Sequence, residues 1–309
     1  MKSSKRWICF LFLVTGSALY AQSWANPANW DKIPEPKTTK DIVYFPADAP
    51  GYTPSAQLLN LYQNSALKPG EKAPVLVFLH GGGWTVGERP ENYNSFRPWL
   101  LAGFSLVTVE YRMAHGPNGI APAAVQDVGC VLAWVRQNAA KYNFDPERVV
   151  TSGNSAGGHL ALLAAVLPKD NDIELPQCKD QARIVAVIDS AGPYNLVLPD
   201  SMKQSKLKKD IEGWMGPDPK PSLQEKEHKL SPSSYIRPGI PPVFQIHGDA
   251  DLTVPYQESL DLKRDLDKAG VKNSMYTAVG GGHGKSTPQQ TLDSKIDALR
   301  FVQSVGVFK

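Results

Sequence analysis

The sequence lacks the features that would place it among membrane, nucleic-acid-binding or zinc proteins. Its 309 residues include only three cysteines, with no CxxC pair and no Cys and His spacing of a structural zinc site. Basic residues exceed acidic ones by only three, so no strong charge marks a nucleic acid or anionic lipid partner. No apolar run reaches the roughly 18 residues of a membrane-spanning helix. The composition is that of a globular protein.

The N-terminus resembles a secretory signal peptide. It opens with the three basic residues Lys2, Lys5 and Arg6. An apolar run over residues 7–14 and a small-residue region follow, with cleavage expected after Ala21 or Ala25. We therefore expect residues 1–25 to be a signal peptide and residues 26–309 to form one domain, with an uncleaved anchor as the alternative. The leader carries the whole charge excess, so the mature chain is near neutral.

A cleaved leader places the protein outside the cytoplasm, secreted or periplasmic, and away from the membrane. Cys130 and Cys178 remain in the mature chain. In an oxidising compartment they form either one disulfide or two free thiols.

The order of the expected elements predicts an α/β fold. Short β-branched runs predict strands at residues 41–45, 58–62, 75–80, 105–111, 148–152, 184–189, 243–247 and 274–279. Apolar residues at spacings of three and four predict helices at residues 121–141, 156–167, 257–269 and 288–303. This alternation indicates a mostly parallel sheet of about eight strands with helices on both faces. Residues 168–241 contain one predicted strand and are expected to form a small insertion before the penultimate strand.

The strongest local motif predicts a nucleophilic serine. Gly153, Asn154, Ser155, Ala156 and Gly157 follow a predicted strand directly and precede a predicted helix directly. In this context GxSxG is typical of a sharp strand-to-helix turn that lifts the central hydroxyl above the sheet edge. Ser155 is therefore the predicted nucleophile, the alternative being a glycine-rich helix start.

A second glycine motif, HGGGW, spans residues 80–84 and follows the strand at 75–80. Backbone N–H groups at such a turn can stabilise the oxyanion that forms in acyl transfer. We predict Gly82 and Gly83, with the amide of Ala156, as the donors. Trp84 is predicted to close the acyl side of the pocket or, equally, to be part of the core.

A nucleophilic serine needs a histidine base that a carboxylate orients, in the chain order serine, acid, histidine. Of the six histidines, only His283 follows the last predicted strand. The loop after the penultimate strand offers two acids, Asp249 and Asp251. Spacing alone does not choose between them.

The motifs HGGGW, GNSAGGH, HGDADLTVP and GGGHG, in this order, resemble those of the α/β-hydrolase superfamily. They are most similar to bacterial carboxylesterases and acetylxylan and feruloyl esterases of the BD-FAE type, relatives of the hormone-sensitive lipase and prolyl oligopeptidase groups. The resemblance covers nearly the whole chain from about Val43 and implies an α/β-hydrolase fold. The family pattern HGxxDxxVP implies Asp251 as the catalytic acid. DSAGPYNL at residues 189–196 departs from the family's usual aromatic residue followed by Gly-Pro-Thr-Asp, so the resemblance leaves the acyl and alcohol pockets undefined.

These features predict a secreted serine esterase that hydrolyses short-acyl, acetyl-type esters on a small molecule or a plant polysaccharide. No metal or organic cofactor and no nucleic acid partner is implied, and no oligomeric state is specified. Two alternatives are a peptidase or amidase of the prolyl oligopeptidase type and a non-catalytic binding protein on a hydrolase scaffold. The first usually has a large N-terminal propeller, and the second generally lacks a triad residue.

Overall fold

The computed structural model describes residues 23–114, 117–202, 204–217 and 222–308. The predicted leader falls almost entirely on residues 1–22, which lie outside the described residues. The strands are β1 Lys37–Val43, β2 Leu58–Gln63, β3 Ala73–Leu79, β4 Ser105–Val109, β5 Phe144–Asn154, β6 Ile184–Ser190, β7 Val243–Gly248 and β8 Asn273–Ala278. The helices are α2 Arg97–Leu101, α3 Ala123–Gln137, α4 Ala139–Tyr142, α5 Ala156–Val166, α6 Lys206–Met215, α7 Leu223–Leu230, α8 Tyr256–Lys268 and α9 Pro288–Ser304.

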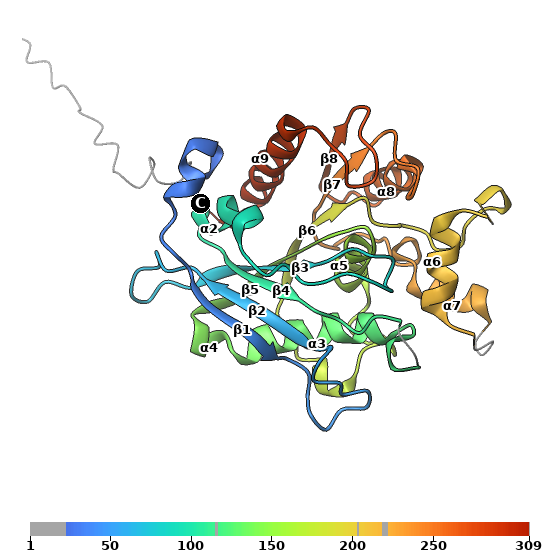
Figure 1. Cartoon of the computed structure of the whole chain (residues 1–309), viewed down its shortest axis with the longest axis horizontal. Coiled ribbons are helices and arrows are strands. Elements are labelled where there is room, and N and C mark those ends of the chain that lie inside the picture. Colours follow the sequence, from blue (N-terminus) through green and yellow to red (C-terminus); the bar gives the residue numbers. More distant parts are fainter. Residues whose placement is uncertain (1–22, 115–116, 203, 218–221, 309) are drawn as a thin grey trace, which may run out of the picture.

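The eight strands form one sheet in the order β1-β2-β4-β3-β5-β6-β7-β8 (Figure 1). β1 pairs antiparallel with β2, and β2 pairs antiparallel with β4. Every later neighbouring pair, from β4–β3 to β7–β8, is parallel. The predicted α/β fold with a mostly parallel sheet is confirmed, and so is the short insertion before the penultimate strand. Parallel strands bring the loops after β3, β5, β6, β7 and β8 to one edge.

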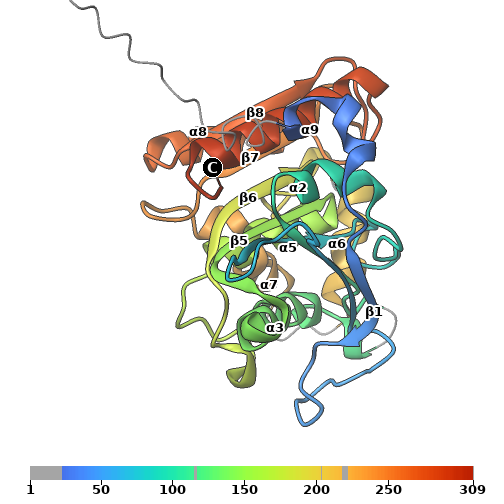
Figure 2. The same ribbon diagram turned by 90° about the vertical axis from the view of Figure 1, so that its left-hand side faces the viewer.

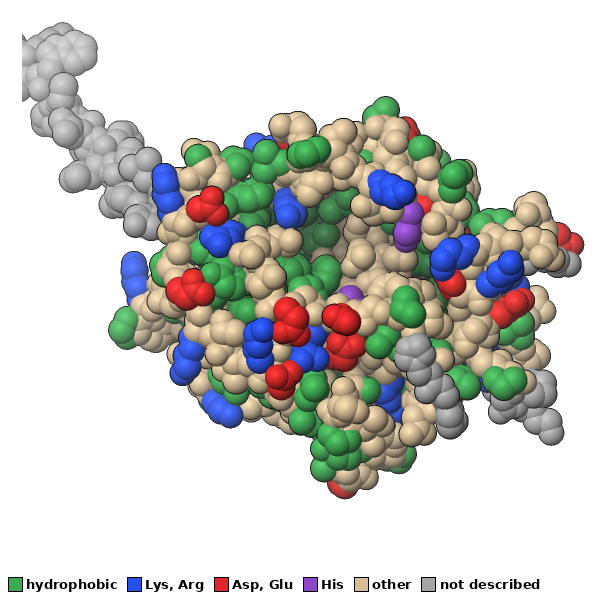
Figure 3. Space-filling model, viewed as in Figure 1, with side chains coloured by type: hydrophobic (Ala, Val, Ile, Leu, Met, Phe, Trp, Pro, Cys, Tyr) green, Lys and Arg blue, Asp and Glu red, His purple; other side chains and the backbone are tan. Residues whose placement is uncertain are grey.

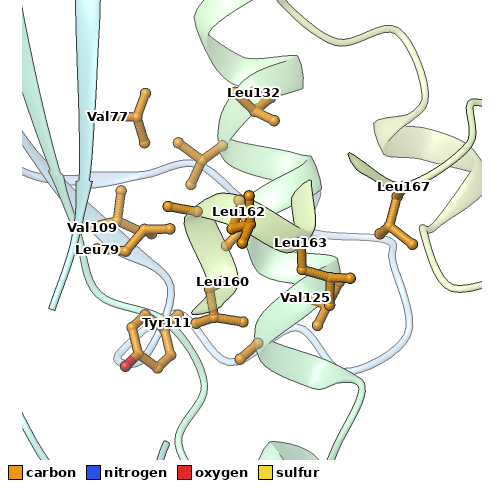
Figure 4. Packing of buried hydrophobic residues seen from close by; sticks show 14 of the residues in the cluster. Val77, Leu79, Val109, Tyr111, Val125, Leu132, Leu160, Leu162, Leu163 and Leu167 are labelled. Carbon is orange, nitrogen blue, oxygen red and sulfur yellow. The ribbon is translucent and has the colours of Figure 1, made fainter. Parts of the chain in front are cut away.

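Successive residues of the central strands pack into two different cores, because side chains alternate between the faces of a sheet. One core joins Leu61, Val77, Val107, Val149 and Val187 to helices α3 and α5. The labelled residues of Figure 4 belong to this core and include Val77 and Leu79 of β3 opposite Leu160 of α5. The other core joins Tyr62, Leu76, Leu106, Val150 and Ile188 to helices α2 and α9. Helices therefore cover both faces, with α9 and α3 on opposite sides of the sheet in Figure 2.

The insertion between β6 and β7 carries α6 and α7, which form an ion pair with each other. Lys208 of α6 pairs with Glu227 of α7, and both side chains are largely buried. The insertion is also tied to the nucleophile helix, because Nε2 of His159 lies 2.7 Å from the carbonyl oxygen of Leu230. These contacts hold α6 and α7 beside α5.

Cys130 of α3 and Cys178 form a disulfide, which decides between the two states that the sequence left open. The bridge joins residues 48 positions apart. In the chain-entropy account, closing a loop of that length stabilises the fold by about 4 kcal/mol. Within the described part of the chain, no helix has the length and apolar character needed to cross a bilayer.

A buried carboxyl group lies behind the start of α5. Asp189, near the end of β6, is 1% exposed and lies beside Gly158 in the first turn of α5. Its Oδ1 accepts a hydrogen bond of 3.0 Å from the N–H of Gly192. Burial raises the pKa of Asp189 to about 7, although the nearby His247 and the Gly192 N–H oppose that change.

The raised pKa predicts a pH-dependent term in stability. The folded state binds the Asp189 proton more tightly than the unfolded chain, whose pKa is about 4. That stabilisation is therefore complete below pH 4 and is lost as pH rises through about 7, a change of about 4 kcal/mol. Asp189→Asn keeps an acceptor for Gly192 but cannot ionise. We expect the variant to match the wild type near pH 4 and to become more stable than it by pH 8.

Urea unfolding of both proteins at pH 4, 5.5, 7 and 8 measures this difference in the free energy of unfolding. Asp170→Asn, at an exposed site, is the matched control and should show no such trend. A difference between Asp189→Asn and wild type that stays constant over the pH range would contradict the prediction.

Candidate active site

Ser155 occupies a strained turn between β5 and α5. Its backbone has φ 54° and ψ −123°, a region that residues with a Cβ rarely adopt. The Ser155 N–H donates to the carbonyl of Ser190 at 2.8 Å, and the Ser155 carbonyl accepts from the N–H of His159 at 3.0 Å. A Cβ at Gly157 would lie 2.1 Å from the carbonyl oxygen of Leu79, so only glycine fits there. The two bonds and this close packing hold the turn, which leaves the Ser155 side chain partly exposed.

The structure brings His283 to Ser155 from the loop after β8. Nε2 of His283 lies 2.9 Å from Oγ of Ser155, and Nδ1 lies 2.7 Å from Oδ2 of Asp251. The His283 side chain is 26% exposed whereas that of Asp251 is fully buried. With Nδ1–H donating to the carboxylate, Nε2 is free to accept the serine proton. This is the geometry of a Ser-His-Asp triad.

Asp251 is held as a carboxylate by several donors. Its Oδ1 accepts from the N–H groups of Thr253 at 2.7 Å and Val254 at 3.0 Å. Burial opposes ionisation, but the hydrogen bonds from His247, His283 and the Thr253 N–H outweigh it and hold the pKa of Asp251 well below its usual range. The negative charge therefore persists at neutral pH and stabilises the imidazolium that forms when His283 takes a proton.

The other candidate acid, Asp249, has a different position. Its side chain is exposed, and Oδ1 accepts a hydrogen bond of 2.6 Å from the N–H of Gly280. Asp249 therefore links the loop after β7 to the loop that carries His283, whereas the carboxylate at Nδ1 of the imidazole is that of Asp251. The structure assigns Asp251, rather than Asp249, to the histidine.

His247 belongs to the site although the sequence predicts it only as the last residue of the strand at 243–247. Its Nε2 lies 3.2 Å from Oδ2 of Asp251 and 3.0 Å from the carbonyl of Val254, and its Nδ1 lies 2.7 Å from Oγ of Ser259. Two acceptors at Nε2 indicate that this nitrogen carries the proton, with Nδ1 accepting from the hydroxyl. The signal was present in the sequence, because the same HGxxDxxVP pattern contains the histidine.

The glycine loop after β3 supplies candidate oxyanion donors. Gly82 and Gly83 have positive φ angles of 123° and 59°. A Cβ at Gly82 would lie 1.8 Å from the carbonyl oxygen of Val86, so no larger residue fits. Among the described residues, no acceptor is paired with the N–H of Gly82 or Gly83. The N–H of Ala156, at the first position of α5, has no acceptor within its helix either.

Trp84, which the sequence placed either at the pocket or in the core, is 1% exposed and belongs to the core. Its ring stacks on Trp214 of α6, with the centroids 4.6 Å apart, and makes a T-shaped contact with His159 of α5 at a centroid separation of 5.1 Å. Trp84 therefore connects the glycine loop after β3, which carries the candidate oxyanion donors, to both the insertion and α5.

The site's chemistry is carried by side chains and backbone amides. Among the described residues, no group of three His, Cys, Asp or Glu side chains is arranged to hold a metal ion.

Curated relatives of this chain are esterases. Esterase LipQ of Mycobacterium tuberculosis is 29% identical over 299 residues, which cover 95% of this chain and 69% of LipQ. The probable carboxylic ester hydrolase LipM of the same organism is 30% identical over 221 residues, which cover 70% of this chain and 51% of LipM. The chain thus spans between half and about two thirds of the length of these relatives.

Solved structures give a similar result. A truncated carbohydrate esterase from gut microbiota superposes with a TM-score of 0.69 at 25% identity, over 88% of this chain and 96% of that one. Esterase 2 of Thermogutta terrifontis with bound propionate gives a TM-score of 0.67 at 27% identity, over 89% of this chain and 96% of that one.

The BD-FAE family profile matches residues 59–266, which include Ser155 and Asp251. The chain therefore belongs to the BD-FAE family of α/β-hydrolase esterases.

Proposed function

We propose that this protein hydrolyses carboxylic esters through an acyl-enzyme on Ser155. The observation that carries the proposal is the chain of two hydrogen bonds from Ser155 through His283 to Asp251. Oγ of Ser155 attacks the ester carbonyl while Nε2 of His283 takes its proton and passes it to the departing alcohol. Water then repeats the sequence and releases the acid, with Asp251 holding the imidazole throughout.

The oxyanion of each tetrahedral intermediate would bind the N–H groups of Gly82, Gly83 and Ala156. These donors belong to rigid backbone, so they need no rearrangement when charge develops. Loss of one such donor typically costs on the order of 10²-fold to 10³-fold in rate. The stacking of Trp84 on Trp214 keeps the loop in place.

We further propose that the acyl group is short and that the natural alcohol is a carbohydrate. The Thermogutta terrifontis esterase has been solved with propionate and with butyrate, and the gut relative is named a carbohydrate esterase. The insertion supports the same substrate class, because the apolar side chains of α6 are buried and Leu223 is the one exposed apolar side chain of α7. These two helices therefore offer no continuous apolar surface for a long acyl chain. No described feature favours the peptidase alternative, and the complete triad argues against a binding protein.

Export of the chain with removal of its leader is part of the proposal. The disulfide supports it, since disulfides persist in oxidising compartments. Trp24, only 2% exposed, packs edge-on against Phe308, and its carbonyl accepts a hydrogen bond from the Nε1–H of Trp30. Cleavage after Ala25 would remove this core residue, so cleavage after Ala21 is preferred.

The export proposal predicts a mature chain that begins at Gln22. N-terminal sequencing of protein recovered outside the cytoplasm of a bacterial host checks this. A mature chain that starts at Asn26, or a full-length chain that remains with the membrane, would contradict it.

The proposed substrate class predicts that activity falls with acyl length. We expect kcat/KM to be highest on acetyl to butyryl nitrophenyl esters and to decline at octanoyl and palmitoyl. A lipase would show the reverse, because each CH₂ buried in an acyl pocket adds about 0.8 kcal/mol. Acetylated xylan and an aminoacyl anilide complete the panel, with Ser155→Ala as the blank. A maximum at octanoyl or longer would rule out the short-acyl pocket, and preferred anilide cleavage would favour the peptidase.

The two neighbouring acids give a matched pair of variants. In Asp251→Asn the amide donates to Nδ1 of His283, which moves the ring proton to Nε2 and prevents it from accepting the serine proton. We expect kcat to fall by about 10⁴-fold with little change in fold. Asp249→Asn keeps an acceptor for Gly280, and its kcat should fall less than about tenfold. Steady-state kinetics on nitrophenyl acetate measures kcat for both variants, and equal losses would remove Asp251 from its assigned role.

A further inference from the structure

A cavity of about 490 Å³ adjoins the nucleophile turn on the face of the sheet covered by α2 and α9. Its lining includes Asn154, directly before Ser155, and Gly282 and Gly284, on either side of His283. The face drawn in Figure 3 is hollowed near its centre, with hydrophobic side chains in the hollow and basic, acidic and histidine side chains around it. The triad mechanism described above does not use this cavity.

One wall of the cavity is apolar and largely aromatic. It is formed by side chains from β3, β6, β7 and the α2 region, namely Phe78, Phe96, Trp99, Ile188 and Ile246. The rings of Phe78 and Phe96 meet edge to face with their centroids 4.8 Å apart. Such a wall suits a flat apolar group, which gains about 25 cal/mol for each Å² of surface removed from water.

A second wall, formed by the loop after β8 and by α9, is basic and rich in hydroxyl groups. Lys285, Ser286, Thr291, Ser294 and Lys295 line it, and no Asp or Glu is present among the lining residues that the structure describes. Hydroxyls there are partly engaged with each other, as in the 2.7 Å contact between Ser286 and Thr291. The wall therefore presents two cations to the cavity without a built-in counter-charge.

Lys295 of α9 is the more unusual of these cations. It is half-buried, and within the described residues no carboxylate lies at ion-pair distance from its Nζ. Asp297, two positions along α9, pairs with Arg300 instead, and Asp293 accepts from Gln289. Burial without a partner lowers the pKa of Lys295. A bound anion would offset that cost, because a charge removed from water needs a counter-charge.

The cavity adjoins the loop that carries His283, the residue that serves the departing group. His283 delivers its proton from Nε2 to the leaving oxygen, so the alcohol part of the ester must sit next to this ring. The residues on both sides of His283 line the cavity. The alcohol part of an ester whose carbonyl carbon is held at Ser155 can therefore extend past His283 into the cavity.

We propose that this cavity binds the alcohol part of an ester that also carries a carboxylate. An apolar ring or sugar face lies on the Phe78, Phe96 and Trp99 wall, and the carboxylate pairs with Lys295. The substrate class is thus an acyl ester of a hydroxy acid, such as a hydroxybenzoate or a uronate. This inference rests on the proposed esterase function and specifies its substrate.

Hydrolysis of 3-acetoxybenzoate and of its neutral analogue 3-acetoxybenzamide tests the inference. Each gives acetate and a phenol with the addition of one water, and the two substrates differ only in charge. The kcat/KM for 3-acetoxybenzoate divided by that for 3-acetoxybenzamide should fall about tenfold or more in Lys295→Met, mainly through a higher KM for the benzoate. The ratio should recover in Lys295→Arg. Lys68→Met, at the exposed turn before β3, is the control and should keep the wild-type ratio. If Lys295→Met keeps the same ratio as the wild type, the inference is overturned.

A second pair of substrates places the carboxylate in the acyl part instead. The mono-4-nitrophenyl ester of adipic acid is compared with 4-nitrophenyl hexanoate. The ratio for this pair should be the same in Lys295→Met as in the wild type. A fall here, rather than with the acetoxy pair, would assign the cavity to the acyl group and contradict the proposal.

Binding of the product 3-hydroxybenzoate provides a readout that does not depend on catalysis. By calorimetry on Ser155→Ala, the added change Lys295→Met should weaken Kd about tenfold. Equal binding in the two proteins overturns the cavity assignment even if esters are hydrolysed. If the wild-type protein hydrolyses no ester but 3-hydroxybenzoate still binds more weakly after Lys295→Met, the proposed function is overturned and the anion site remains supported.

Discussion

The backbone turn at Ser155 is the constraint on which the rest of the site depends. A serine at φ 54° persists only because its surroundings hold it there. The Ser190 carbonyl fixes its N–H, α5 begins immediately after it, and Gly157 lets that helix approach the end of β3. One geometry thereby sets both the direction of the nucleophile and the distance between the Ala156 amide and the glycine loop. Substitutions at these contacts would disturb nucleophile and oxyanion donors together.

Burial has opposite consequences at two carboxyl groups near this turn. Asp251 is buried but receives donors from His247, His283 and two backbone N–H groups, so it stays charged and serves as the acid of the triad. Asp189 is more deeply buried, at 1% exposed against 7% for Asp251, and has one N–H partner, so burial raises its pKa to about 7. Deeper burial and fewer donors together give Asp189 a higher pKa than Asp251.

Local patterns in the sequence were sufficient for the fold and for part of the site. The alternation of strands and helices predicted the mostly parallel sheet, and the GxSxG context and chain order pointed to Ser155 and His283. Spacing could not choose between Asp249 and Asp251, because both lie in one loop and only its path decides which faces the imidazole. The stacking of Trp84 on Trp214 joins segments 130 positions apart in the chain. No periodicity or motif encodes such a contact, and the same holds for the cavity that Lys295 lines.

The geometry assigns the nucleophile of an acyl-transfer site to Ser155. Reaction with an organophosphonate ester, followed by mass spectrometry of the digested protein, tests this assignment. We expect one adduct per chain, on Ser155, forming in step with loss of esterase activity and absent from Asp251→Asn on the same timescale. An adduct on Ser152, Ser190 or any other serine, or full activity remaining after Ser155 is modified, would contradict it.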